Sequence, residues 1–529
     1  MTLGKDEITI RAKEYEKAVS FVEDLMKKHH IIRYTANETM LVFDALYRNI
    51  MSQGLDPDKE LRISGAEKFG ELMVQIGFEG HRFSALAEET EEVSPENKIL
   101  TGFSDKLDNV YHTGYNTFRI TVKRNYSGIA LSNMAALLAA IIVYVLIRLI
   151  TGTTGDIEYL AVKYVYPLET AFANTILMLA APVTFLTLLK NLTNVYIVSE
   201  RNSKVQRLYI DAVLTSALMI VLALAFGYLA LSNTGALKGI LADYIGNSRG
   251  TFLLEGVNSI FPSNLFAVFI ETSPFPIIIV AILLTYALCS AGAYFEIMKT
   301  AIDTLYSIFS RMLTVVMYFL PAAFFLAIMD TMLSGGFTDL LFLIGAIAVL
   351  VVSLVVPAIC YFIILLVNGV RPAAFFRKLM PLIRENLKIN SVIDAAPYNT
   401  RYCSRVFGYD YKKLQDYIPV LAQVNLDGNC YILTVFTMLF FITGDISVSW
   451  KGMIVLCILI LFMSFGAPNQ PGSCLIGGLI ILNYFNSYTQ LTNIVIAVEV
   501  FMGSILNIFN LTGDIVTLAI DNERQNRKT

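Results

Sequence analysis

Residues 423–429 read Gln423-Val424-Asn425-Leu426-Asp427-Gly428-Asn429, and they interrupt a long apolar run. An Asp-Gly pair inside such a run is a point where a helix can unwind, and the unwound turn exposes backbone carbonyls beside the Asp427 carboxylate. Hard cations prefer oxygen ligands of this kind, from carboxylates, amides and carbonyls. The segment therefore predicts a cation site at an interrupted membrane helix.

A second group of oxygen-bearing side chains lies in the last apolar run, residues 494–520. At about 100° per residue, Asn507, Asn510 and Asp514 lie on one helical face. A buried carboxylate needs a counter-charge, and no Lys or Arg lies between Lys451 and Arg524. A bound cation would supply that charge. The alternative, in which Asp514 is protonated or lies near the membrane surface, stays open.

The composition indicates a membrane protein. The 529 residues are 55% hydrophobic and 16% charged, whereas a soluble protein has roughly 25% charged residues. From residue 129 onward, apolar runs approach the ~20 residues that cross a bilayer: 129–150, 168–189, 207–233, 274–297, 310–331 and 338–368. We therefore expect an α-helical polytopic membrane protein of about eight spans, and not an enzyme.

Two polar breaks rich in Gly and Pro interrupt the C-terminal half. The first lies within residues 386–419 and the second, residues 466–473, divides the apolar run 452–483. Non-helical backbone at membrane depth is stable only where protein or a water-filled cavity satisfies its polar groups. The breaks predict two re-entrant helical hairpins with a substrate site between them.

The N-terminal part has a different character. It shows no signal-peptide pattern, and Arg119, Lys123 and Arg124 precede the first span. By the positive-inside rule the N-terminus is cytoplasmic, in a multi-pass protein of the plasma (inner) membrane. Amphipathic patterning predicts a small α/β domain over residues 1–125 with helices near 13–30 and 37–51, a strand at 119–123 and an acidic loop at 88–96.

Several motifs lie in the same order and spacing as those of a known family. Asn425-Leu426-Asp427-Gly428-Asn429 is similar to Asn-Met-Asp-Gly-Thr, Asn510-Leu511-Thr512-Gly513-Asp514 to Asn-Val-Thr-Gly-Asp, and Gly466-Ala467-Pro468-Asn469 to Gly-Val-Pro-Gly. Leu214-Thr215-Ser216-Ala217 matches a Leu-Thr-Ser-Ala run, and further similarities lie at Pro262–Asn264, at Ala396-Pro397 with Arg401, and at Ile418-Pro419. Over residues 126–523 the chain resembles the dicarboxylate/amino acid:cation symporters, which include the glutamate transporters; residues 524–529 are a polar tail.

The resemblance implies particular cation ligands. One sodium site would use Asn425, Asn510 and Asp514, and another would use Thr215, Ser216, Asn425 and Asp427. A third would use backbone carbonyls near residues 461–464. A tyrosine that the family places in the third span is replaced here by Ala212. The resemblance favours Na⁺ as the coupling ion and leaves H⁺ open.

The substrate positions depart from the family pattern. Where acidic-substrate members have an arginine for the substrate's side-chain carboxylate, this chain has Leu506, and where they have an aspartate for the substrate's ammonium group it has Gly503. A buried carboxylate without a partner costs several kcal/mol, so we expect neither glutamate nor aspartate as substrate. Asp394 and Glu499 favour a neutral or cationic solute, with a water-facing Glu499 as the alternative. The predicted substrate-binding residues are Ser391, Asp394, Asn429, Pro468, Asn469, Gly503, Leu506, Asn507 and Asn510.

The N-terminal domain faintly resembles a degenerate histidine-kinase-like ATPase domain. Asn49 on a helix, a Gly77-x-x-Gly80 turn and a Thr113–Asn116 segment carry the resemblance, but the carboxylate expected before Gly77 is absent. A regulatory or oligomer-stabilising module is the alternative.

The leading hypothesis is a cation-coupled symporter for a small organic solute. The resemblance implies inverted repeats and a homotrimer in membrane lipid, with an elevator movement coupled to closure of the second hairpin. We expect no nucleic-acid partner. The rival hypothesis is a membrane sensor that does not transport and signals through the N-terminal domain; the retained cation ligands argue against it.

Overall fold

A computed structural model describes most of the chain, and the chain forms two compact units, residues 1–128 and 129–529. The residues outside the description are 1–2, 30, 32, 69–70, 82, 84–99, 101–106, 113, 124–126, 152–158, 202, 232–260, 262–263, 271, 390, 394, 445, 447, 469–471, 485–487 and 528–529. The predicted acidic loop and two predicted substrate residues, Asp394 and Asn469, fall among them.

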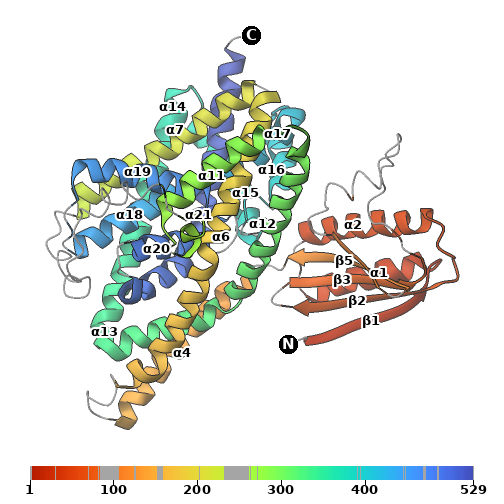
Figure 1. Ribbon diagram of the computed structural model, residues 1–529, viewed down its shortest axis with the longest axis horizontal. Coiled ribbons are helices and arrows are strands. Elements are labelled where there is room, and N and C mark those ends of the chain that lie inside the picture. The colour runs from red at the N-terminus through yellow and green to blue at the C-terminus, as the bar shows by residue number, and fades with distance from the viewer. Residues whose placement is uncertain are drawn as a thin grey trace. The chain divides into compact units, whose positions relative to one another are not determined.

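In the residues that the structure describes, the N-terminal unit is an antiparallel sheet with two full helices (Figure 1). The strand order is β1-β2-β3-β5-β4. The strands are β1 (Leu3–Arg11), β2 (Glu60–Lys68), β3 (Glu71–Glu79), β4 (Leu107–His112) and β5 (Tyr115–Lys123), and the helices are α1 (Tyr15–Lys28) and α2 (Arg33–Ser52). Alternate residues such as Val74, Ile76 and Phe78 are buried in a core that the two helices share. Both predicted helices and the predicted strand are present.

One prediction for this unit is wrong. Gly77 does not begin a turn, because it lies inside β3 and pairs with Arg62 on one side and Thr117 on the other. A Cβ at Gly77 would lie 2.5 Å from the hydroxyl oxygen of Tyr115. The glycine is therefore explained by a side chain that crosses the sheet at this point, and a phosphate-binding turn is not needed to explain it.

The second unit is built from helices. In chain order they are α4 (Ser127–Thr151), η2 (Ala161–Val165), α6 (Tyr166–Arg201), α7 (Ser203–Phe226), η3 (Gly227–Leu231), α10 (Ala267–Ile270), α11 (Pro274–Cys289), η4 (Gly292–Tyr294), α12 (Phe295–Met317), α13 (Leu320–Ser353), α14 (Val355–Val367), α15 (Pro372–Ile389), α16 (Ala396–Tyr402), η5 (Cys403–Phe407), α17 (Tyr411–Val424), α18 (Asp427–Thr443), α19 (Trp450–Phe465), α20 (Ser473–Tyr484) and α21 (Tyr488–Asn526). Helix α21 packs against α13, α18 and α20 near the middle of this unit (Figure 1).

Within the described residues, six helical stretches are long and apolar enough to cross a membrane: Leu131–Ile150, Ala161–Ile197, Val205–Leu229, Leu320–Val367, Tyr411–Thr443 and Thr492–Gln525. The fourth has 48 residues, so at ~1.5 Å per residue it is about 72 Å long, more than twice the ~30 Å hydrocarbon core. It is bent at Gly336, which has a φ of 69°. The prediction of a polytopic helical membrane protein is confirmed.

Two predicted spans have different boundaries in the structure. The run 310–331 is divided, because α12 ends at Met317 and Pro321 stands in the first turn of α13. Proline fixes φ and lacks an N–H, so it begins a helix more easily than it continues one. The run 274–297 is likewise divided after Cys289, where Gly292 has a φ of 59°.

Both polar breaks in the C-terminal half lie between two helices. Helices α15 and α16 form the first hairpin, whose arms are joined by paired amides: Asn386 Nδ2 donates to Asn399 Oδ1 at 2.8 Å and Asn399 Nδ2 to Asn386 Oδ1 at 3.2 Å. Helices α19 and α20 form the second hairpin. Each hairpin is followed by helices that carry one of the predicted cation motifs, α17–α18 after the first and α21 after the second.

Candidate functional site

The helix is interrupted where the Asn-Leu-Asp-Gly motif predicts. Helix α17 ends at Val424 and α18 begins at Asp427, and between them Asn425 and Leu426 have ψ angles of 74° and 53°. These angles lie far from the helical value of about −42°. The break sets the Asn425 side chain and the Asp427 carboxylate beside each other at the start of α18.

The Asp427 carboxylate is fully buried and receives a hydroxyl donor on each oxygen. Ser216 Oγ on α7 donates to Oδ1 at 2.7 Å, and the Tyr361 hydroxyl on α14 donates to Oδ2 at 2.9 Å. Thr215, next to Ser216, donates to Asn425 Oδ1 at 3.1 Å. The structure thus brings together the four residues of one predicted sodium site.

Tyr361 was not predicted by sequence reasoning, which placed no ligand on α14. It comes from α14, whereas the tyrosine that the resemblance implies belongs to the third span, where this chain has Ala212. Its signal in the sequence is weak, since a tyrosine in an apolar run is ordinary. Its hydroxyl is also 3.3 Å from the Phe509 carbonyl on α21, so it links three helices at the cluster.

Helix α21 approaches α18 closely at two glycines. The Gly428 N–H donates to Asn510 Oδ1 at 2.8 Å, and a Cβ at Gly428 would lie 2.8 Å from the Leu506 carbonyl oxygen. A Cβ at Gly513 would lie 2.5 Å from Asp427 Oδ2. The glycines of the Asp-Gly and Thr-Gly-Asp motifs are therefore required by the contact between the two helices.

Asp514 is the remaining carboxylate of the cluster, and its hydrogen bonding differs from that of Asp427. Its side chain is 1% exposed, and neither carboxylate oxygen has a hydrogen-bond partner among the described residues. Among the described residues, the buried Asn425 amide nitrogen also has no hydrogen-bond partner. Orphaned buried carboxylate oxygens beside amide and hydroxyl oxygens are a donor set that fits a hard cation such as Na⁺.

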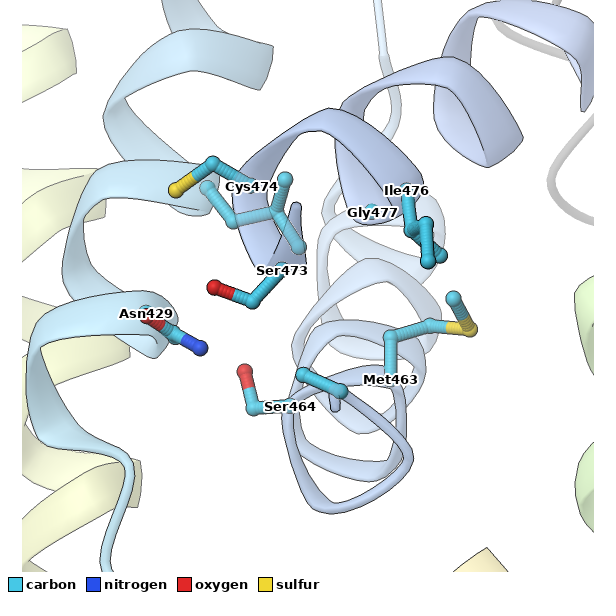
Figure 2. A pocket seen from close by; sticks show the side chains of 9 residues that line it. Asn429, Met463, Ser464, Ser473, Cys474, Ile476 and Gly477 are labelled. Atoms are coloured by element: carbon cyan, nitrogen blue, oxygen red, sulfur yellow. The ribbon is translucent and has the colours of Figure 1, made fainter. Parts of the chain in front are cut away.

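Three of the predicted substrate residues line two hollows: Asn429 lines one, and Ser391 and Asn507 line the other. The larger, of about 300 Å³ including its open mouth, is lined by Asn429 on α18 together with residues of the second hairpin. Figure 2 shows the Asn429 amide and the Ser464 and Ser473 hydroxyls pointing toward one another across this hollow. The Asn429 Oδ1 and Ser464 Oγ atoms are buried and have no partner among the described residues. Ser464 and Ser473 were not named as substrate residues by sequence reasoning.

The smaller hollow, of about 180 Å³, lies at the first hairpin. Ser391 of the first hairpin and Asn507 of α21 line it together with Asn386. Pro468 and Leu506 are buried, and Leu506 is part of the hydrophobic core. Ser391 and Asn507 thus lie together at the first hairpin, while Asn429 faces the second hairpin.

Glu499 lines neither of these two hollows and does not face water, the two positions that the sequence left open. It is 5% exposed, so it does not face water, and its carboxylate accepts hydrogen bonds from the backbone N–H groups of Gly472 and Leu475 at 2.7 and 3.1 Å. Its charge is therefore directed at the second hairpin and not at a cationic solute.

A broken helix, two hairpins and buried oxygen clusters define the class of membrane carriers that bind cations and solutes at interrupted helices. The family model of the sodium:dicarboxylate symporter family matches residues 135–523. The chain therefore belongs to that family, whose members are transporters and not enzymes. No curated protein matches the chain.

Proposed function

We propose that this protein is a Na⁺-coupled symporter for a small neutral, polar organic solute. The observation that carries the proposal is the Asp514 carboxylate, which is buried with both oxygens lacking partners among the described residues, next to the fully buried Asp427. Two ionised carboxylates buried in one cluster repel each other unless a cation lies between them or one of them is protonated. Sodium at Asn425, Asn510 and Asp514 would supply that charge, with a second ion at Thr215, Ser216 and Asp427.

The larger hollow supports the assignment of a neutral solute. Among its described lining residues none carries a charge, and the polar groups are an amide and two hydroxyls. These groups both donate and accept hydrogen bonds, so they match amide or hydroxyl groups of a solute. Leu506 and Gly503 offer no partner to a carboxylate or an ammonium group. We therefore propose that L-glutamate and L-aspartate are not substrates.

Coupling would follow from the position of the second hairpin. Its residues Ser464 and Ser473 line the hollow, and Asn429 joins the hollow to the Asn425–Asp427 cluster through α18. Cation and solute would together favour the closed hairpin, and each would raise the affinity for the other by the same factor. We propose that the unit acts in a homotrimer of the inner membrane, with an elevator movement and a cytoplasmic N-terminus.

Thermal unfolding of the purified full-length protein with a library of neutral and charged solutes tests the proposal. Each solute is measured in NaCl and in choline chloride at equal ionic strength. We expect stabilisation by a neutral polar solute only in Na⁺, and none by L-glutamate or L-aspartate.

A solute found in this way is then tested for uptake into proteoliposomes under an inward Na⁺ gradient. Accumulation that a Na⁺ ionophore abolishes supports symport. Binding without any accumulation would instead favour the sensor, and accumulation driven by a pH gradient without Na⁺ would replace Na⁺ by H⁺ as the coupling ion.

A further inference from the structure

The buried Glu499 carboxylate is bound by backbone amides at the start of a helix. Both of its oxygens are used, Oε1 by the N–H of Gly472 and Oε2 by the N–H of Leu475. These two amides lie at the start of α20, the second arm of the second hairpin. Glu499 itself belongs to α21, so the contact joins two different helices.

The first turn of a helix prefers an anion for two reasons. Its N–H groups have no partner within the helix, and the helix dipole places partial positive charge there. Helix α20 has 12 residues, long enough for both effects. The charge of Glu499 is thus offset by backbone amides, and this carboxylate differs from Asp514, whose oxygens have no donors among the described residues.

Gly503, one turn further along α21, leaves the space that this arrangement needs. A Cβ at this position would lie 2.9 Å from Glu499 Oε1. A side chain at 503 would therefore push the Glu499 carboxylate away from α20. A glycine at 503, where the resemblance implies an aspartate, is thus what allows the Glu499 carboxylate to reach the start of α20.

The same end of α20 forms one wall of the larger hollow. Ser473 and Cys474 line the hollow, and they lie between Gly472 and Leu475, the two residues that bind Glu499. The hydrogen bonds from these two amides to Glu499 hold the start of α20 against α21. They thereby fix the position of the Ser473 hydroxyl relative to Asn429.

We propose that Glu499 is a built-in anion that fills a carboxylate-binding site at the start of α20 and so positions the solute-facing wall of the second hairpin. Removal of the side chain would leave a site for a small monocarboxylate such as formate or acetate. The proposal deepens the assignment of a neutral solute, because the chain's own carboxylate occupies the place where a substrate carboxylate could bind.

Chemical rescue tests the proposal on the purified full-length protein. Glu499→Ala should lower the Tm relative to wild type, and sodium formate or acetate should raise the Tm of the variant saturably at constant Na⁺. Formate, with three non-hydrogen atoms, binds at best with a Kd of about 0.5 mM, and acetate, with four, at best with about 0.04 mM, so half-maximal rescue is expected at or above these concentrations. Neutral acetamide should not rescue, and wild type should not respond to any of these compounds.

Glu169→Ala is the matched control. Glu169 is equally buried, at 4% exposed, but its Oε2 atom has no hydrogen-bond partner among the described residues, so formate should not rescue the loss of this side chain. Equal rescue of both variants would show a general salt effect and overturn the proposal. So would a Glu499→Ala variant with the Tm of wild type, or one that formate and acetate leave unchanged.

Glu499→Gln keeps the proposal falsifiable if the alanine variant does not fold. Glutamine keeps the size of the side chain, so it should fold with a lower Tm and show no response to formate. A glutamine variant as stable as wild type would overturn the role of the charge. These readouts require neither transport nor an identified solute, so a failed solute screen leaves them intact, and a failed rescue leaves the Na⁺-coupled symport proposal intact.

Discussion

Asp427 and Asp514 lie in one buried cluster, yet their surroundings are opposite. Asp427 has a hydroxyl donor on each oxygen, from Ser216 and Tyr361. Asp514 has no hydrogen-bond partner for either oxygen among the described residues. Burial of an ionised carboxylate is unfavourable unless hydrogen bonds or an opposite charge compensate it. Hydroxyl groups of the protein compensate the buried charge of Asp427. The described residues provide no such donor for Asp514, so we expect a bound cation to compensate its charge.

The difference assigns separate tasks to the two aspartates. Asp427 is part of a preformed hydrogen-bond network that holds α7, α14 and α18 together, with or without a cation. In the proposed symporter, Asp514 carries the charge that would make cation binding favourable. Substitutions at the two positions should therefore differ in the sign of their effect on stability when Na⁺ is absent.

The largest effect is expected from Asp514→Asn. The amide keeps an oxygen but removes the charge that offsets the dehydration of the ion, so Na⁺-dependent stabilisation should be lost. For wild type at a Na⁺ concentration 100 times its Kd, this stabilisation is about 2.7 kcal/mol. In choline chloride the variant should be at least as stable as wild type, because an uncompensated buried carboxylate has been removed. Tm measured against Na⁺ concentration at constant ionic strength tests both statements.

Asp521→Asn is the control on the same helix. Asp521 lies seven residues after Asp514 and accepts a hydrogen bond from Gln525 at 2.5 Å. This variant should keep the Na⁺ dependence of wild type. If Asp514→Asn also kept it, Asp514 would not be a cation ligand.

A smaller loss of Na⁺ dependence, with a clear loss of stability, is expected from Asp427→Asn. An asparagine can accept from one hydroxyl but presents its NH₂ group to the other, so a buried hydroxyl is left facing a donor. An unsatisfied buried group costs about 1–3 kcal/mol, and this cost should appear in choline chloride as well as in NaCl. Chemical unfolding in both salts separates this variant from Asp514→Asn. Equal behaviour of the two variants would contradict the division of tasks.

Much of this cluster was predictable because its members are polar side chains in apolar sequence. Asn425, Asp427, Asn510 and Asp514 stand out within largely apolar runs, and the helix period places the last two on one face. Similarly, the Asp-Gly pair indicated the helix break. A strong local contrast between polar and apolar residues thus located the centre of the site.

The remaining parts depend on contacts between distant segments, which no local pattern encodes. Tyr361 reaches Asp427 across 66 positions, and Glu499 reaches the start of α20 across 27. Ser464 and Ser473 line one hollow with Asn429 because both arms of the second hairpin pack against α18. Sequence reasoning found which residues are chemically unusual, but the packing decides which residues each of them contacts.

Tyr361→Phe should lower the stability modestly. It removes one donor from Asp427 and leaves the other in place, so we expect a loss of about 1 kcal/mol of stability. The Na⁺ dependence should change little, because the charge on Asp514 is unaffected. Ser216→Ala removes the donor on the other oxygen and is the matched variant. A larger effect of Tyr361→Phe on Na⁺ affinity than on stability would show that the tyrosine oxygen is itself a cation ligand.

The smallest effect on the cluster is expected from removal of residues 1–118. The N-terminal unit has its own hydrophobic core, and the residues that match the family model begin only at 135. The truncated chain keeps Arg119, Lys123 and Arg124, so the positive charge that sets orientation remains before the first span. We expect it to insert, to form the same oligomer as the full chain and to show an unchanged Na⁺ dependence of Tm, with altered regulation of uptake. Chain mass in detergent, measured by light scattering, and the Na⁺ titration test this together. A truncated protein that fails to insert or assemble would show that the N-terminal unit is a structural part of the carrier.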